Sequence, residues 1–129
     1  MSAITEIYTR LSDDATLTGL VGARIYPLTA PQGDAYPFVT FQVVSRTGSV
    51  ALDASSSMAA LRLQVDCYGE TFTSARAVAE AVRARLDDWR GSGSVQLATL
   101  TNDRDQYDGD DAVRLYRAMQ EYEIVFLQD

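Results

Sequence analysis

Covalent chemistry in this chain would have to use its one cysteine, Cys67. It lies in the stretch Val65-Asp66-Cys67-Tyr68-Gly69, where an alternating segment ends at a glycine and a helical pattern begins. Strand-turn-helix corners of this kind hold many catalytic thiols and hydroxyls. A nucleophilic thiol usually relies on a histidine base, and the chain contains no histidine. Asp66 or Glu70 would have to take that part.

The alternation around Cys67 indicates where the thiol points. A cysteine in register with aliphatic side chains is most simply a small buried hydrophobe, and burial raises the pKa of a thiol and suppresses the thiolate that attacks. We therefore expect Cys67 in the core and no catalytic residue. The enzyme alternative predicts a thiol that reacts with iodoacetamide in the folded protein. One face of the strand carries Leu61, Leu63, Val65 and Cys67, and the other carries Arg62, Gln64, Asp66 and Tyr68.

Metal and nucleotide sites have little support in the sequence. One cysteine without any histidine cannot build a structural zinc site, and the chain has neither a P-loop nor a GxGxxG turn. The segment NDRDQYDGDDA at 102–112 is rich in aspartate, but it places Asp108 where an EF-hand requires glycine and Arg114 where it requires glutamate. We expect a solvated acidic turn and no cofactor, with weak cation binding or docking to a basic partner as alternatives.

The overall charge argues against nucleic acid as a binding target. The formal net charge is −7, and all 11 basic residues are arginines dispersed along the chain. Such a surface repels DNA and anionic membranes on average. No apolar run approaches the roughly 18 residues that span a bilayer, and the first residues show no basic, apolar leader. We expect synthesis in a cytosol, no membrane contact and no disulfide within the chain.

The first part of the chain has a helical pattern followed by a loop. Apolar residues at helical spacing predict a helix over 4–11, and the side chains of 12–14 can cap a second helical stretch that Gly22 ends. Residues 24–26 look extended before an irregular surface loop, which is marked by the prolines at 27, 31 and 37.

The rest of the chain alternates strands with one long helix. Alternation predicts strands over 38–46 and 61–68, and an apolar stripe over 71–89, capped by its first residue, predicts the helix. Strands over 95–100 and 115–127 should pair as a long hairpin around the acidic turn. These elements predict a single α+β domain over 1–129, with an antiparallel sheet of four strands, or slightly more, and two helices packed on one face.

The segment Gly48–Ala59 is long for a connection between two strands, because hairpin loops need only about two to five residues. Val50, Leu52 and Met58 would be exposed apolar groups if the segment stood free. Sparse apolar anchors among small residues are typical of a connection that orders against a neighbouring subunit, and a loop that stays disordered is the alternative.

Three stretches cover most of the chain and resemble one family in their pattern of structure. They are LTGLVGARIYPLTAPQGDAYPFVTFQ at 17–42, LRLQVDCYGETFTSARAVAEAVRARLD at 61–87 and NDRDQYDGDDAVRLYRAMQEYEI at 102–124. The chain resembles the tail completion or tail terminator proteins of long-tailed bacteriophages, prophages and gene transfer agents. The resemblance implies an antiparallel sheet with helices on one face, a six-membered ring that caps the finished tail tube, and no catalytic residues.

The resemblance also implies partners and a location. The chain would contact copies of itself in a homo-hexamer ring, the tail tube protein, and a head-closure or connector protein, while DNA passes through the channel without specific binding. It would assemble in the host bacterial cytoplasm and reside in the virion at the head-tail junction. A head-closure or neck connector ring protein is the nearest alternative, and a cytosolic binding adaptor, which would form no ring, is the next.

Contacts with a subunit or partner are expected at two kinds of residue. The first kind is the apolar residues of the segment at 48–59, and the second is the charged residues of the central strand and the acidic turn. The set is Val50, Leu52, Met58, Arg62, Asp66, Asp103, Asp105 and Asp108.

Overall fold

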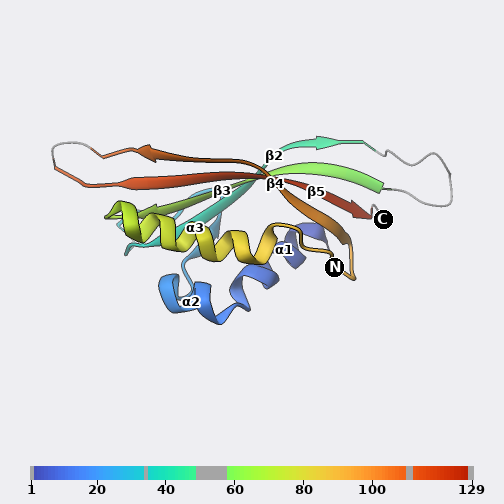
Figure 1. Ribbon diagram of the computed structural model, residues 1–129, viewed down its shortest axis with the longest axis horizontal. Coiled ribbons are helices and arrows are strands. Elements are labelled where there is room, and N and C mark those ends of the chain that lie inside the picture. Colours follow the sequence, from blue (N-terminus) through green and yellow to red (C-terminus); the bar gives the residue numbers. More distant parts are fainter. Residues whose placement is uncertain (1, 34, 49–57, 110–111, 128–129) are drawn as a thin grey trace.

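The computed structural model of the protein describes residues 2–33, 35–48, 58–109 and 112–127. Three helices lie on one face of a twisted sheet, and two pairs of strands reach past the helices toward opposite ends of the molecule (Figure 1). The helices are α1 (Ala3–Ser12), α2 (Ala15–Val21) and α3 (Phe72–Leu86). The strands are β1 (Ile25–Pro27), β2 (Phe38–Thr47), β3 (Met58–Gly69), β4 (Val95–Tyr107) and β5 (Tyr116–Leu127).

Each helix begins at a side chain that accepts a hydrogen bond from a backbone N–H of the first turn, a group that has no partner within the helix. The predicted caps of the second and third helices are confirmed. α2 also ends as predicted at Gly22, whose φ of 60° favours glycine. The cap contacts are Ser2 Oγ with Thr5 N at 3.2 Å, Asp14 Oδ2 with Leu17 N at 2.8 Å, and Thr71 Oγ1 with Ser74 N at 3.0 Å.

The strands form one five-stranded sheet in the order β1-β2-β3-β5-β4. β1 runs parallel to β2, and the other neighbouring pairs are antiparallel. The predicted α+β class fits this arrangement, but the sheet is mixed rather than wholly antiparallel, has five strands rather than four, and is covered by three helices rather than two. The sequence had indicated both additional elements, α2 as a second helical stretch ending at Gly22 and β1 as an extended piece at 24–26. With only 7 and 3 residues, their local patterns did not show that α2 is one of the helices over the sheet or that β1 joins it.

β4 is longer than the sequence predicted. It continues past Leu100 to Tyr107 opposite β5, so Asp103 and Asp105 lie on a strand and not in a turn. A β-bulge between Leu100 and Asn102 interrupts the alternation of side chains along β4, so the sequence pattern did not indicate that the strand continues.

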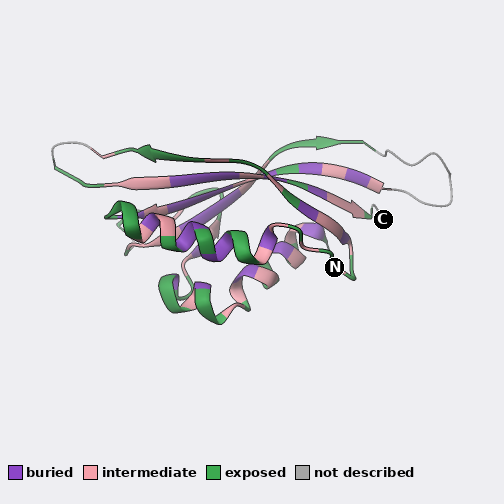
Figure 2. Ribbon diagram, in the orientation of Figure 1, coloured by how far each residue is buried: buried purple, intermediate pink, exposed green. Residues whose placement is uncertain are grey.

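The core lies between the three helices and one face of the sheet (Figure 2). The predicted apolar face of α3 is confirmed up to Leu86, where the helix ends. The prediction that Trp89 continues this face was wrong: Asp88 has a φ of 59°, and Trp89 instead pairs with Ala98 of β4. The fully buried side chains that join the layers include Ile7, Leu11, Leu17, Leu63, Val65, Val78, Val82, Leu86, Tyr122 and Ile124.

The connection between β2 and β3 is shorter than the predicted segment Gly48–Ala59, because Met58 and Ala59 already belong to β3. Met58 is half-buried and pairs in register with Leu127. Val50 and Leu52 lie outside the described residues.

Candidate interaction surfaces

Cys67 is completely buried on the helix-facing side of β3. Val39 of β2 and Ala118 of β5 flank it in register, and both are buried as well. Burial, and then the nearby Asp66 carboxylate, raises the pKa of the thiol far above its ordinary value. The Asp66 side chain alternates to the opposite face of the sheet, and Glu70 is exposed. The predicted core position of Cys67 is therefore confirmed.

Arg76 of α3 binds three carboxylates. Its Nη1 donates to Asp103 Oδ1 at 3.0 Å and to Asp105 Oδ1 at 2.8 Å, and its Nη2 donates to Asp103 Oδ2 and Glu80 Oε2, both at 3.0 Å. The hydrogen bonds from Arg76 hold the pKa of Asp103 below its ordinary value, and the same contacts raise the pKa of Arg76. Because Asp103 and Asp105 belong to β4, Arg76 fastens α3 to the projecting β4-β5 arm.

A buried polar contact that the sequence did not predict lies beside this cluster. Gln120 of β5 is fully buried, donates from Nε2 to Ala79 O at 3.0 Å, and accepts at Oε1 from the Tyr122 hydroxyl at 2.7 Å. Burial raises the pKa of Tyr122. The sequence could have indicated this buried amide, because Gln120 lies between Ala118 and Tyr122 on a face of β5 that is otherwise apolar. Its hydrogen bonds offset the cost of burying an amide and link β5 to α3.

The sheet face without helices, called here the open face, also holds a buried carboxylate. Asp66 is only 5% exposed. Gln64 Nε2 donates to Asp66 Oδ2 at 3.0 Å, and Arg117 Nη1 lies 3.8 Å from Asp66 Oδ1. Burial raises the pKa of Asp66 because the cost of desolvation outweighs these two favourable contacts.

Arg117 also reaches the carboxylate at the base of the acidic turn. Its Nε lies 2.9 Å from Asp108 Oδ2, and its guanidinium carbon lies 5.9 Å from the centroid of the Tyr68 ring. Arg117 therefore connects Asp66 and Asp108 across the open face.

The predicted contact residues thus fall into separate places. The structure brings Asp103 and Asp105 together at Arg76, and Asp66 and Asp108 together at Arg117, so all four carboxylates have an arginine of the same chain. Arg62 is exposed on the open face, 3.8 Å from Glu121 Oε2. Met58 lies at the end of β3, apart from both clusters.

An apolar groove that the sequence did not indicate lies along the β1 edge of the sheet. Its lining includes Ile4 and Tyr8 of α1, Leu28 after β1, and Phe41 and Val43 of β2. Leu28 is 67% exposed, although it is a large apolar side chain. Because these residues come from three separate elements, no single stretch of sequence contains the groove.

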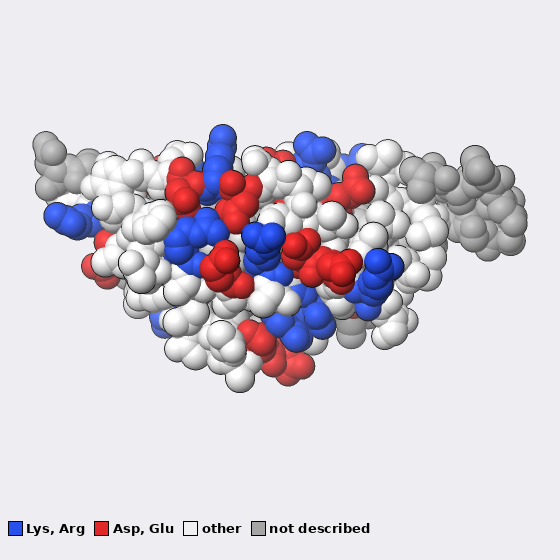
Figure 3. All heavy atoms as spheres, in the orientation of Figure 1, with Lys and Arg blue, Asp and Glu red and all other residues white. Residues whose placement is uncertain are grey.

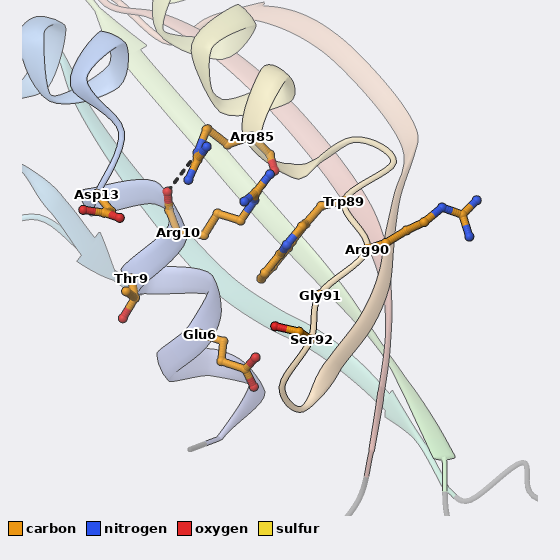
Figure 4. Close-up of a pocket in the computed structure, with 9 residues that line it drawn as sticks. All are labelled: Glu6, Thr9, Arg10, Asp13, Arg85, Trp89, Arg90, Gly91 and Ser92. Carbon is orange, nitrogen blue, oxygen red and sulfur yellow. Dashed lines mark hydrogen bonds between the residues drawn. The ribbon is translucent and has the colours of Figure 1, made fainter.

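A polar cleft lies between α1 and the loop that follows α3 (Figure 4). Arg10 Nε donates to Arg85 O at 2.7 Å, Arg85 Nε donates to Arg10 O at 3.1 Å, and the Arg10 guanidinium lies 4.7 Å from the centroid of the Trp89 ring. Arg90 points away from the cleft, and Glu6 lies across from Trp89 (Figure 4). Arg10 and Arg85 therefore join two helices, which is a structural use of both guanidinium groups.

Charges of both signs alternate over the molecular face in Figure 3, without a large patch of one sign. Among the described residues, no group of three or more histidine, cysteine, aspartate or glutamate side chains has the arrangement of a metal site. None of the helices in the described ranges has the length and apolar character required to cross a bilayer. The surfaces that stand out are therefore the strand arms, their edges and the apolar groove.

Comparison with known proteins agrees with this architecture. Residues 5–127 match the family described as Tail completion protein gp17. A chain in the solved structure "Virion of native gene transfer agent (GTA) particle" shares the fold, with a TM-score of 0.74 and 19% sequence identity over 99% of this chain and 100% of that chain. No curated protein sequence gives a significant match.

The family match extends over nearly the whole chain, from α1 to the end of β5. It therefore includes both strand arms, the Arg76 cluster and, apart from Ile4, the residues named for the apolar groove. The chain belongs to the Tail completion protein gp17 family, and it is a structural protein of the bacteriophage-type virion.

Proposed function

We propose that the protein caps the tail tube as a ring, ends tube polymerisation and forms the tail side of the head-tail junction. The observation that carries this proposal is the family match over residues 5–127. The shape of the protein also supports a role in assembly, because two pairs of strands project past the helical body toward opposite ends (Figure 1). Such projections give a small subunit contact surface well away from its own core.

The proposed ring is a homo-hexamer built by one repeated contact. A contact between two different surfaces of the same subunit closes into a ring when the rotation per step divides a full turn. Each contact needs about 1,000 Å² of buried surface to be stable. Subunits alone in solution would then be monomers or weak oligomers that form rings at high concentration or on the end of a tube.

The proposed partners are the tail tube protein on one side of the ring and a head-closure or connector protein on the other. Subunits would assemble in the host bacterial cytoplasm. DNA would pass through the ring without specific binding, a hypothesis prompted by the net charge of −7. A channel wall dominated by arginine in an assembled ring would refute that part.

Electron microscopy of the purified protein, alone and mixed with tail tubes, tests the proposal. We expect rings at one end of each tube, with six-fold symmetry in end views. Rings that bind isolated head connectors but never a tube end would instead favour a head-closure or neck protein. A monomer that binds neither would favour an adaptor.

A further inference from the structure

We propose that neighbouring subunits join edge to edge, with the second half of β4 pairing antiparallel to the second half of β2 in the next copy of the chain. One sheet would then continue from subunit to subunit. This inference rests on the ring proposed above and names the surface that closes it.

The outer edge of β4 is covered only over its first half. Ala98 N donates to Trp89 O at 2.8 Å, and Leu100 N donates to Asp87 Oδ1 at 3.0 Å. From Asn102 to Tyr107, no other element of the described chain pairs with this edge. Open strand edges present unpaired N–H and C=O groups and are templates for another strand.

Alternation identifies which backbone groups of β4 face outward. The backbone N–H of Leu100 points away from β5, and the bulge before Asn102 shifts the alternation of backbone groups by one residue. Beyond the bulge, Asp108 N donates toward β5, to Leu115 O at 2.8 Å. Asp103, Asp105 and Tyr107 therefore direct their backbone groups away from β5.

The outer edge of β2 is covered only over its first half in the same way. β1 pairs with Val39, Thr40 and Phe41, and Leu28 N donates to Phe41 O at 2.9 Å. From Gln42 to Thr47 no described element covers the edge. The bulge between Val43 and Ser45 shifts the alternation, so the backbone of Arg46 faces outward.

The two open edges fit one repeating contact. They lie on opposite sides of the sheet and toward opposite ends of the molecule, β2 at the upper right and β4 at the upper left of Figure 1. Antiparallel pairing through β3 and β5 makes β2 and β4 run in opposite directions. A copy that extends the sheet beyond β4 therefore presents its β2 in the antiparallel sense. A contact between two different edges is heterologous, as a ring requires.

The side chains at these edges are complementary in charge. Arg46 pairs in register with core-facing Leu61, and Asp103 pairs with core-facing Gln120, so both lie on the helix-covered face. Arg46 is exposed and makes no ion pair with the described residues, while the side chain of Asp105, which shares that face, is 47% exposed. In the continued sheet, Arg46 of one copy becomes a cross-strand neighbour of Asp105 in the next.

In the same register, the Tyr107 side chain of one copy would lie against the apolar groove of the next copy. Placing Asp105 opposite Arg46 in antiparallel sense brings Tyr107 toward Val43, which lines the groove together with Leu28. Tyr107 is 51% exposed in the single chain. Backbone pairing, charge and apolar contact thus agree on one alignment.

Two proline variants, each with an alanine control, test the contact. Asp105→Pro and Arg46→Pro each remove an outward N–H without touching a hydrogen bond inside the sheet, and edge strands tolerate proline. Asp105→Ala and Arg46→Ala lose the same charges but keep the N–H. We expect each proline variant to need a roughly tenfold higher concentration than its alanine control for half-maximal ring formation on tail tubes. Circular dichroism checks that all four variants fold.

Mixing the two proline variants gives a sharper result. Asp105→Pro keeps only the β2 edge and Arg46→Pro keeps only the β4 edge, so an equimolar mixture should stop at heterodimers in native mass spectrometry, while each variant alone stays monomeric. If the proline variants form rings as readily as the wild-type protein, the edge contact is overturned while the proposed function stands. Proline variants that form free rings yet fail to bind tubes would assign the edges to the tube protein and overturn the edge contact as well. Wild-type protein without any rings would overturn the proposed function too.

Discussion

Among single residues, Cys67 decides whether the protein has covalent chemistry. Because its side chain is fully buried and its pKa is raised, we expect no reaction with iodoacetamide in the folded protein and full alkylation in urea. Mass spectrometry of the intact chain measures both states. Rapid alkylation without denaturant, as fast as for a free thiol, would contradict the burial and reopen the enzyme alternative.

Asp66 should leave a signature in the pH dependence of stability. Its pKa is raised on folding, mainly by burial, so the folded protein holds this proton more tightly than the unfolded chain does. The cost of ionisation therefore appears as pH rises above about 4, the ordinary pKa of aspartate. Asp66→Asn removes that cost, and we expect the variant to gain stability relative to wild type between pH 4 and pH 7. Urea unfolding across this range measures the difference, and a constant difference would contradict the assignment.

Ionisation of Asp103 should have the opposite effect on stability, stabilising the folded protein. Arg76 holds its pKa below the ordinary value, so its stabilising contribution is present above about pH 4 and is lost as pH falls through the lowered pKa. We expect Asp103→Asn to cost about 1 kcal/mol at pH 7, the upper end for an ion pair with partial exposure, and progressively less as the pH falls toward 2. The same urea titrations measure it. A loss that persists unchanged at pH 2 would mean that packing, not charge, explains the effect.

Among helices and strands, α3 holds the fold together, since it packs on the sheet and carries Arg76. Its first turn depends on the Thr71 cap, in which Oγ1 accepts from Ser74 N at 3.0 Å. We expect Thr71→Ala to lower the free energy of unfolding by about 1 kcal/mol. Thr73→Ala is the matched control, because Thr73 is exposed in the same turn and does not cap it. Equal effects of the two substitutions in thermal unfolding would rule out the cap.

The sequence predicted the elements whose pattern is local. The alternation around Leu63 placed β3 and its thiol correctly, and the caps at Asp14 and Thr71 marked helix starts. β1 was recognised as an extended piece, but its parallel pairing with β2 depends on where α2 returns the chain, which no local pattern contains. The second half of β4 was missed because its order comes from β5 and from Arg76, contacts distant in sequence.

The candidate surfaces were predictable only in part. Alternation placed Asp66 correctly on the central strand, but the sequence put Asp103, Asp105 and Asp108 in an acidic turn and did not indicate the arginines that pair with all four carboxylates. Arg76 reaches β4 only because α3 crosses that part of the sheet, and Arg117 reaches Asp66 through cross-strand register. The groove along β1 required three separate elements to meet.

For the whole molecule, the internal pairing of charge has a consequence for assembly. The described carboxylates of the β4-β5 arm, Asp103, Asp105 and Asp108, each pair with an arginine of the same chain, and among them the Asp105 side chain keeps 47% of its surface exposed for a further contact. What the described chain leaves uncovered is the pair of half-open strand edges and an apolar groove beside one of them. These are features of a subunit that acts through shape and contact.

The most direct test is to add the purified protein to growing tail tubes and follow tube length by electron microscopy over time. A cap that occupies the growing end should halt elongation, with roughly one ring on each stopped tube. The average rate of tube elongation should fall as the concentration of the protein rises. An unrelated acidic protein at the same concentration is the control. Tubes that keep lengthening at the control rate, with no ring at their ends, would contradict the central claim.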